Sequence, residues 1–381
     1  MCPLPAGTRF PLAAATVRYG RRRVGCAGFD VPRGSASLGT AVGVHPPSPL
    51  GDRAAAAIRR GLTTFPTGVG GAGVSPSPPA PHSSPTYDRS SLTVIGAGQM
   101  GSGIAQVAAA AAAFDAVRLA DVRSGAAAAA VAAIGRRLDR RVASGRMGVD
   151  AAAAARKALV PLDTCDVAAI GASSAVVVEA VAEDAGVKAN LFGRLDAAAP
   201  ASTLLASNTS SISITSLAAA AARHPDRVVG LHFFHPVPSM NVVELIPGLA
   251  TSAETLAAAR SIAATMGMTV AMVRDEPGFV ANRLLMPYIN EAAAALGSGV
   301  ATRDDIDAVM VQGTGVPMGP LALADFIGLD TCVAILRVLE AGLGGAYKPT
   351  PLLVRHVAAG RLGVKSGRGF YEYDEAGKRK A

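Results

Sequence analysis

The sequence predicts an α/β fold, in which a doubly wound parallel sheet is followed by an all-helical C-terminal domain. Short apolar runs alternate with Ala-rich helical stretches from Ser91 to Val273, and such alternation is typical of parallel sheets. From Pro277 onward the strand-like runs stop, and helical stretches broken by Gly and Pro take over. A chain of 381 residues has room for two such domains. We expect the sheet domain to span 91–276 and the helical domain 277–381.

Each expected strand is a short apolar run with polar or turn-forming residues on both sides. These runs lie at 92–95, 117–120, 176–178, 204–206, 228–234, 242–246 and 269–273. Longer stretches with helical character occupy about 124–142 in the sheet domain and 279–296, 303–311, 321–339 and 352–359 in the helical domain.

Residues 1–90 differ from the rest of the chain in composition. They hold ten Arg, no Lys, three Asp and no Glu, so they account for +7 of the total charge of +8. A segment so rich in Pro, Gly and Ser cannot bury enough apolar surface to fold, and we expect a disordered leader. An Arg-rich, acid-poor leader fits a mitochondrial or plastid transit peptide. An over-extended gene prediction and a plain disordered tail are equally weighted alternatives.

Several classes of protein are disfavoured by charge, hydropathy and cysteine content. The folded part is nearly neutral, whereas a nucleic-acid-binding domain is expected to carry a basic face. No apolar stretch reaches the roughly 18 residues of a transmembrane helix. The four Cys have no metal-ligand spacing, which indicates reduced thiols in an intracellular protein without a metal site. We therefore expect no nucleic-acid, membrane or metal partner.

A G-x-G-x-x-G motif follows the first expected strand and opens a helix, which is the context of a dinucleotide site. Gly96 permits the tight turn, Gly98 lets the backbone approach a pyrophosphate, and Gly101 lets the helix pack closely on the strand. Gln99 and Met100 complete the turn, where the N–H groups of the helix start face the phosphates.

The acidic residue at the end of the second strand indicates which dinucleotide is bound. Asp121 lies twenty residues beyond Gly101 and can accept hydrogen bonds from the adenosine ribose, while its charge would repel a 2′-phosphate. The sequence therefore favours NAD over NADP, although Arg123 lies two residues further on.

Two polar segments, 207–211 and 231–238, follow expected strands and are unusual for plain core. Ligands of parallel sheets bind at the carboxyl ends of the strands. His232 suits the removal of a hydroxyl proton during alcohol oxidation, and Glu244 could fix its tautomer and stabilise the imidazolium. From residue chemistry alone, a structural His and a solvent-facing Glu are the stronger alternative.

The motifs together resemble one enzyme family over about 91–373. They are the segments 94–101 (VIGAGQMG), 207–211 (SNTSS), 231–234 (LHFF), 275–283 (DEPGFVANR), 316–320 (VPMGP) and 365–371 (KSGRGFY). The chain resembles the L-3-hydroxyacyl-CoA dehydrogenases, including bacterial 3-hydroxybutyryl-CoA dehydrogenases. The resemblance implies a Rossmann-type domain, a helical domain that forms a homodimer, NAD as cofactor, and oxidation of a 3-hydroxyacyl-CoA to a 3-ketoacyl-CoA.

The resemblance also implies roles for individual residues. His232 matches the general base and Glu244 its partner, while Ser210 and Asn282 match residues beside the substrate. Contacts with NAD are implied for Glu183, Lys188, Ser210, His235 and Lys365.

The chain departs from the family pattern at two places. His235 replaces a usual Asn that contacts substrate or nicotinamide. A His can still donate a hydrogen bond there, but it is bulkier. The usual CoA-binding Ser and Lys are not evident. An Arg cluster that includes Arg137, Arg141 and Arg146 could attract the CoA phosphates, with a solvated helix face as the equal alternative.

Three other functions remain open from the sequence. The first is oxidation of a free hydroxy acid, such as a sugar acid, on the same fold. The second is a non-catalytic NAD-binding protein, which His235 supports best. The third is salt-sensitive nucleic-acid binding through the leader.

Overall fold

The computed structural model of the protein describes residues 87–162 and 166–380, which belong to one structural unit, Pro78–Ala381. The predicted leader lies outside the described residues except for its last four. Among the described residues, every helix is too short or too polar to cross a bilayer.

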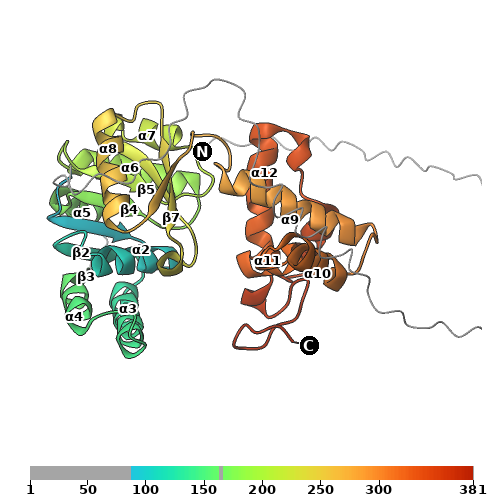
Figure 1. Ribbon diagram of the computed structural model, residues 1–381. Coiled ribbons are helices and arrows are strands. Elements are labelled where there is room, and N and C mark those ends of the chain that lie inside the picture. Colours follow the sequence, from blue (N-terminus) through green and yellow to red (C-terminus); the bar gives the residue numbers. More distant parts are fainter. Residues whose placement is uncertain (1–86, 163–165, 381) are drawn as a thin grey trace, which may run out of the picture. The chain divides into compact units, whose positions relative to one another are not determined.

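The sheet domain is built on one sheet of eight strands in the order β3-β2-β1-β4-β5-β6-β7-β8 (Figure 1). Every expected strand is present, and a short β3 adds to them. The strands are β1 (Ser91–Ile95), β2 (Ala116–Ala120), β3 (Leu159–Pro161), β4 (Val176–Glu179), β5 (Leu204–Ser207), β6 (Val228–Phe233), β7 (Val242–Pro247) and β8 (Thr269–Met272).

The prediction of a parallel sheet is wrong at one place. Strand β7 pairs antiparallel with β6, and β8 then runs parallel to β7. The reason is the short connection 234–241, because a parallel crossover needs a dozen or more residues. This hairpin-like return sets Glu244 opposite His232 in the β6–β7 ladder.

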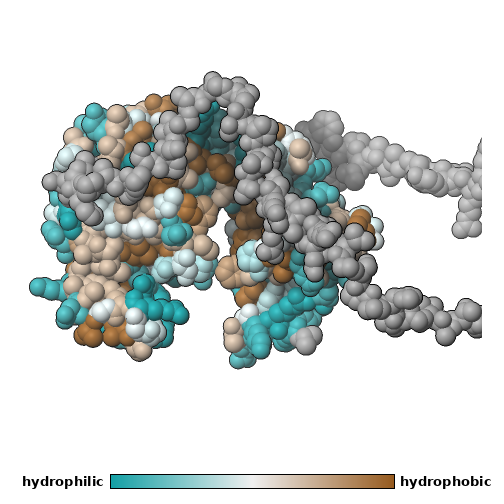
Figure 2. Space-filling view, viewed as in Figure 1, coloured by the Kyte–Doolittle hydropathy of each residue, from teal (hydrophilic) through white to brown (hydrophobic). Residues whose placement is uncertain are grey.

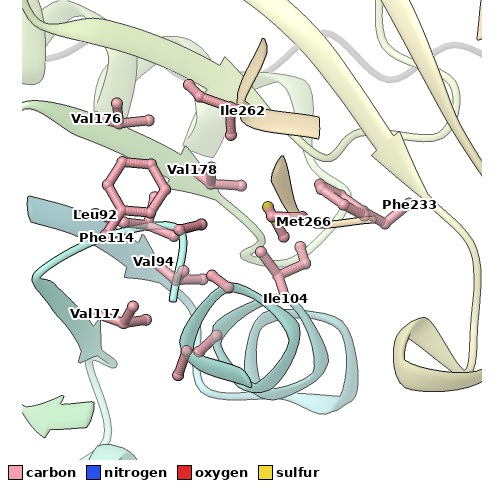
Figure 3. Close-up of a cluster of buried hydrophobic side chains, with 14 of the residues drawn as sticks. Leu92, Val94, Ile104, Phe114, Val117, Val176, Val178, Phe233, Ile262 and Met266 are labelled. Atoms are coloured by element: carbon pink, nitrogen blue, oxygen red, sulfur yellow. The ribbon is translucent and has the colours of Figure 1, made fainter. Parts of the chain in front are cut away.

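Helices cover both faces of the sheet because side chains of a buried strand alternate between two cores. Leu92 and Val94 of β1 join a core with α2, α3, α4 and α8, whereas Ile95 joins a second core with α5, α6 and α7 (Figures 1 and 3). These helices are α2 (Gln99–Ala110), α3 (Ala126–Ala143), α4 (Val149–Ala158), α5 (Val167–Ser173), α6 (Ala185–Ala198), α7 (Ile214–Ala220) and α8 (Ala253–Thr265).

The close-up in Figure 3 shows the first core, where Ile104 of α2 and Met266 after α8 lie near Val94, Val178 and Phe233 of the sheet. Burial of a side chain of this size stabilises the fold by about 1.5–3 kcal/mol. The core therefore holds the start of α2 against the end of β1, where the glycine motif lies.

After β8 the described chain is helical apart from isolated bridges in the segment 363–379, as the sequence predicts. The helices are α9 (Ala281–Gly297), α10 (Arg303–Thr314), α11 (Pro320–Ile327), α12 (Leu329–Leu343) and α13 (Pro351–Ala358). The single helix expected at 321–339 is wrong, since α11 and α12 are separate. Gly328 between them has φ +102, a conformation that cannot continue a right-handed helix.

The C-terminal segment is held on α11 by a buried carboxylate. Asp325 is 1% exposed and accepts hydrogen bonds from the backbone N–H groups of Phe370 and Tyr371 and from the hydroxyl of Tyr373. Burial raises the pKa of Asp325 above its usual value, although these donors act in the opposite direction. The motif 365–371 thus has a structural function in addition to any contact with a ligand.

Candidate active site

The carboxyl ends of the central strands meet at one edge of the sheet. The backbone N–H of Gly96, after β1, donates to the carbonyl of Ala120 at the end of β2, at 2.8 Å. The N–H of Ala180, after β4, donates to the carbonyl of Ile95 at the same distance. The strand order reverses between β1 and β4, and such a switch point is where doubly wound sheets bind ligands.

The glycine turn fits a dinucleotide pyrophosphate. Gly96 has φ +109, and a Cβ on it would lie 2.3 Å from the carbonyl oxygen of Ala180. A Cβ on Gly101 would lie 1.8 Å from the carbonyl oxygen of Gly96, whereas one on Gly98 would meet nothing within 4 Å. The first turn of α2, with Gln99 and Met100, has no side-chain cap and no acidic residue, so its N–H groups suit an anion.

These environments predict opposite outcomes for two alanine substitutions. Gly101→Ala should lower the unfolding temperature, because its methyl group would overlap the backbone of Gly96. Gly98→Ala should keep that temperature within about 2 °C and weaken NADH binding by about tenfold or more, because its methyl group would enter the space that the pyrophosphate needs. Thermal unfolding and calorimetric titration with NADH check both. Unchanged NADH affinity in Gly98→Ala would contradict this assignment.

Asp121 lies at the end of β2, as predicted, and its carboxylate faces the glycine turn. Its Oδ2 accepts a hydrogen bond of 2.8 Å from the N–H of Ala97. Arg123 forms a bidentate ion pair with it through Nε and Nη2, at 2.9 and 3.1 Å. The side-chain bond from Arg123 is the main reason that the pKa of Asp121 is lowered to about 2.

Glu183 organises the polar loop after β5. Its Oε1 accepts hydrogen bonds from the Thr209 hydroxyl at 2.6 Å and from the backbone N–H groups of Ser210 and Ser211 at 2.8 and 3.1 Å. Burial raises the pKa of Glu183, but the charge of Lys188 and these donors outweigh it and lower the pKa below its usual value. An ionised Glu183 therefore fixes the position of Ser210.

Lys188 lies between two carboxylates. Its ammonium is 2.6 Å from Oε1 of Glu179 and 3.1 Å from Oε2 of Glu183, and its side chain is 1% exposed. Glu179 is fully buried and also accepts a 2.6 Å hydrogen bond from the Ser207 hydroxyl. Lys188 is enclosed as a counter-ion in this structure, so the contact with NAD implied for it stays a prediction.

His232 and Glu244 face each other across the β6–β7 ladder. Nδ1 of His232 lies 2.6 Å from Oε2 of Glu244, and both side chains are less than 10% exposed. Burial raises the pKa of Glu244, but the bond from His232 and the N–H groups of Ala281 and Val280 lower it overall. An ionised carboxylate only accepts hydrogen bonds, so Nδ1 carries a proton, and in the neutral form of the ring Nε2 presents a lone pair.

The start of α9 connects the two polar clusters. The N–H groups of Val280 and Ala281 each donate to Oε1 of Glu244 at 3.0 Å. The Asn282 amide donates to the carbonyl of Ser210, also at 3.0 Å. Of the four residues expected to be catalytic, the structure thus joins His232 to Glu244 directly and Ser210 to Asn282 directly.

His235 and Lys365 are the remaining residues expected near the cofactor. His235 is exposed, three residues beyond His232, and its ring centroid lies 5.9 Å from that of Phe326. The Lys365 ammonium lies 2.6 Å from Asp330 at the start of α12. Their expected contacts with NAD stay predictions.

The three Arg residues expected near CoA have different surroundings. Nε of Arg137 donates to the Gln106 amide oxygen at 2.5 Å, whereas Arg146 is exposed beyond the end of α3. Arg141 lines a hollow of about 260 Å³ between α2, α3 and the segment 237–241, and its buried Nε has no hydrogen-bond partner. Figure 2 shows hydrophilic residues gathered over α3.

Sequence reasoning missed two residues that shape the site. Glu179 ends a run of three Val residues, and only its carboxylate at a strand end distinguishes it from core. Asn208 accepts a 2.9 Å hydrogen bond from the N–H of Phe233, which ties the loop after β5 to the strand of His232. The predicted segment 207–211 contained Asn208, but its residue type gives no signal for this backbone contact.

The glycine turn, the Asp at the end of β2 and the buried His–Glu pair fit the class of NAD-dependent dehydrogenases. Comparison with models of protein families identifies the family within this class. Residues 91–276 match the 3-hydroxyacyl-CoA dehydrogenase NAD-binding domain, and residues 278–373 match the 3-hydroxyacyl-CoA dehydrogenase C-terminal domain. The chain belongs to the 3-hydroxyacyl-CoA dehydrogenase family, and its cofactor is NAD.

Individual relatives agree with this family. A probable 3-hydroxybutyryl-CoA dehydrogenase of Bacillus subtilis is 48% identical over 285 residues, which cover 74% of this chain and 97% of that protein. The human mitochondrial hydroxyacyl-coenzyme A dehydrogenase is 41% identical over 74% of this chain and 90% of its own length. The crystal structure of (S)-3-hydroxybutyryl-CoA dehydrogenase from Ralstonia eutropha is similar with a TM-score of 0.70 and 40% identity, covering 75% of this chain and 99% of that one.

Proposed function

We propose that the protein reversibly oxidises the 3-hydroxyl of a short or medium L-3-hydroxyacyl-CoA to the 3-ketoacyl-CoA, with His232 as general base and Glu244 as its partner. The observation that carries the proposal is the 2.6 Å contact between His232 Nδ1 and Glu244 Oε2 at the carboxyl edge of an NAD-binding sheet. The relatives named for 3-hydroxybutyryl-CoA support the substrate class.

The chemistry follows from the hydrogen bonding of the pair. With Nδ1 protonated toward Glu244, the Nε2 lone pair of His232 takes the hydroxyl proton, and Glu244 stabilises the imidazolium. NAD, when bound, accepts the hydride that leaves the carbon. In the reverse direction the imidazolium returns its proton to the carbonyl oxygen.

Ser210 and Asn282 are proposed to orient the substrate. The Ser210 hydroxyl lies within 3.2 Å of Glu183, which holds it at the end of β5. Asn282 is 9% exposed and keeps its amide on the Ser210 carbonyl. A substrate oxygen hydrogen-bonded to Ser210 would then be held by groups whose own positions are fixed.

The Arg cluster is proposed to bind the phosphates of CoA. Burial, together with the charges of Arg140 and Arg136, lowers the pKa of Arg137. The unpartnered Nε of Arg141 beside an open hollow is a donor that a phosphate oxygen could satisfy.

The double variant Arg137→Ala/Arg141→Ala should therefore raise KM for acetoacetyl-CoA by about tenfold or more and change kcat by less than about threefold. Steady-state kinetics with saturating NADH measures both constants. Arg260→Ala on α8 removes one positive charge elsewhere and serves as the control. An unchanged KM in the double variant would favour a free hydroxy acid as substrate.

The experiment that tests the proposed function is NADH oxidation by the full chain, with acetoacetyl-CoA and free acetoacetate compared. We expect turnover with the CoA ester and little with the free acid. Tight NADH binding without turnover of either would contradict the proposal, and a His235→Asn variant would then show whether His235 disables the site.

The helical domain is also proposed to form a homodimer. Several of its apolar side chains are exposed, including Leu284 at 68%, Val300 at 76% and Val309 at 65%. Burial of such residues against a second copy would remove apolar area from water.

A further inference from the structure

The carboxylate of Asp121 already accepts as many hydrogen bonds as it can hold. Oδ1 accepts from the backbone N–H and from Nε of Arg123, both at 2.9 Å. Oδ2 accepts from the N–H of Ala97 at 2.8 Å and from Nη2 of Arg123 at 3.1 Å. A carboxylate has about four acceptor positions, so the Arg123 guanidinium occupies half of them.

Those two positions are the ones that a ribose would use. The backbone donors of Ala97 and Arg123 are fixed by the turns after β1 and β2, whereas the Arg123 side chain can rotate away. Binding of NAD, whose ribose hydroxyls donate to this carboxylate, therefore requires the guanidinium to leave.

The two partners of the ion pair differ in mobility. The Asp121 side chain is 8% exposed and held by backbone donors, whereas that of Arg123 is 69% exposed. Ion pairs with exposed side chains typically contribute little to stability. Displacement of the guanidinium from Asp121 thus needs little free energy. Because Arg123 is only two residues from Asp121, the displaced guanidinium stays near the expected position of the ribose.

We infer that Arg123 is a second determinant of cofactor choice, and that it gives the protein the capacity to bind NADP(H) in addition to NAD(H). Turned away from Asp121, the guanidinium presents two parallel N–H donors, which match the oxygens of a phosphate on the ribose 2′ position. Its positive charge, still beside Asp121, would also reduce the repulsion between that carboxylate and the phosphate. The Arg123 side chain thus competes with the ribose of NAD for the Asp121 carboxylate, and it attracts the 2′-phosphate of NADP(H).

The inference rests on the cofactor site and not on the acyl substrate, so binding alone tests it. NADH and NADPH are titrated by calorimetry into the full-length wild type and into Arg123→Ala, Arg123→Lys and Arg260→Ala, each without acyl-CoA. We expect Arg123→Ala to raise the ratio of the NADPH to the NADH dissociation constant by about tenfold or more, through weaker NADPH binding and equal or tighter NADH binding.

The control variants distinguish the effect of the bidentate hydrogen-bond geometry of Arg123 from the effect of its positive charge. Arg123→Lys keeps the charge without the bidentate geometry, so its ratio should lie between those of the wild type and Arg123→Ala. Arg260→Ala has the same net charge as Arg123→Ala and should keep the wild-type ratio. NADPH should displace bound NADH, which places both at one site, and retained NADH binding shows that each variant is folded.

A ratio that changes by less than about threefold in Arg123→Ala would overturn the inference. Wild-type protein that binds NADH but shows no displacement by NADPH would overturn it as well. Neither result would depend on turnover of acetoacetyl-CoA, so both are distinguishable from failure of the proposed reaction.

Discussion

Replacement of His232 by Gln is expected to reduce the turnover of acetoacetyl-CoA by about 10²–10⁴-fold, the usual contribution of a positioned acid or base. Gln can still donate a hydrogen bond to Glu244, but it cannot carry a proton to or from the substrate oxygen. NADH affinity should change little, because the glycine turn and Asp121 are untouched. Steady-state kinetics and calorimetric titration with NADH measure the two effects.

Glu244→Gln is the matched variant for the same pair. Because Glu244 stabilises the protonated ring, its neutral replacement should make the reduction, which needs that proton, decline at a lower pH than in the wild type. A structural role alone would lower the rate without moving the pH–rate profile. A His232→Gln enzyme with wild-type turnover would exclude this pair as the proton-transfer group.

Replacement of Lys188 by Met should destabilise the fold by about 3–5 kcal/mol, since it removes one partner from a buried ionic cluster. Glu179, fully buried, would lose the cation 2.6 Å from its carboxylate. Glu183 would lose the charge that lowers its pKa, so the loop with Ser210 should be held less firmly. Denaturant unfolding of the full chain measures the change in the free energy of unfolding.

The double variant Lys188→Met/Glu179→Gln distinguishes a charge effect from a packing effect. If the unpaired charge of Glu179 dominates, the double variant should recover at least about 1 kcal/mol relative to Lys188→Met. A Lys188→Met protein with wild-type stability and much weaker NADH binding would instead show that Lys188 contacts the cofactor, as the family resemblance implies.

The elements with a strong local signal were predictable from the sequence. The turn 96–101 and Asp121 have fixed spacing because the geometry of a strand, a turn and a helix is fixed, and the structure places both as expected. Apolar runs likewise identified the long strands. Strand β3 was not predicted, because a strand of three residues that includes Pro161 is too short to show a periodic pattern.

Other features depend on contacts between distant segments, which no local pattern encodes. The single helix expected at 321–339 failed because isolated Gly residues are tolerated in helices, and only the conformation of Gly328 shows the break. The burial of Lys188 was not predictable, because Glu179 ends β4, Glu183 lies in the loop after it and Lys188 lies on α6. Only the geometry of this strand–loop–helix connection brings the three side chains together. The only sequence feature that indicates antiparallel pairing of β7 with β6 is the short connection 234–241.

The antiparallel pairing of β6 and β7 affects which residues near the site can change without moving the His–Glu pair. His232 and Glu244 are ladder partners, and the burial of β6 and β7 helps to hold the strand register that sets their spacing. The connection 234–241 includes His235 and supplies part of the lining of the hollow beside Arg141. Residue exchanges there would change the lining of the hollow, and with it the proposed CoA site, while the buried strands hold the proposed proton-transfer pair in register. The residues proposed to affect substrate preference and those proposed to move the proton thus lie in adjacent parts of one hairpin, the connection and the paired strands.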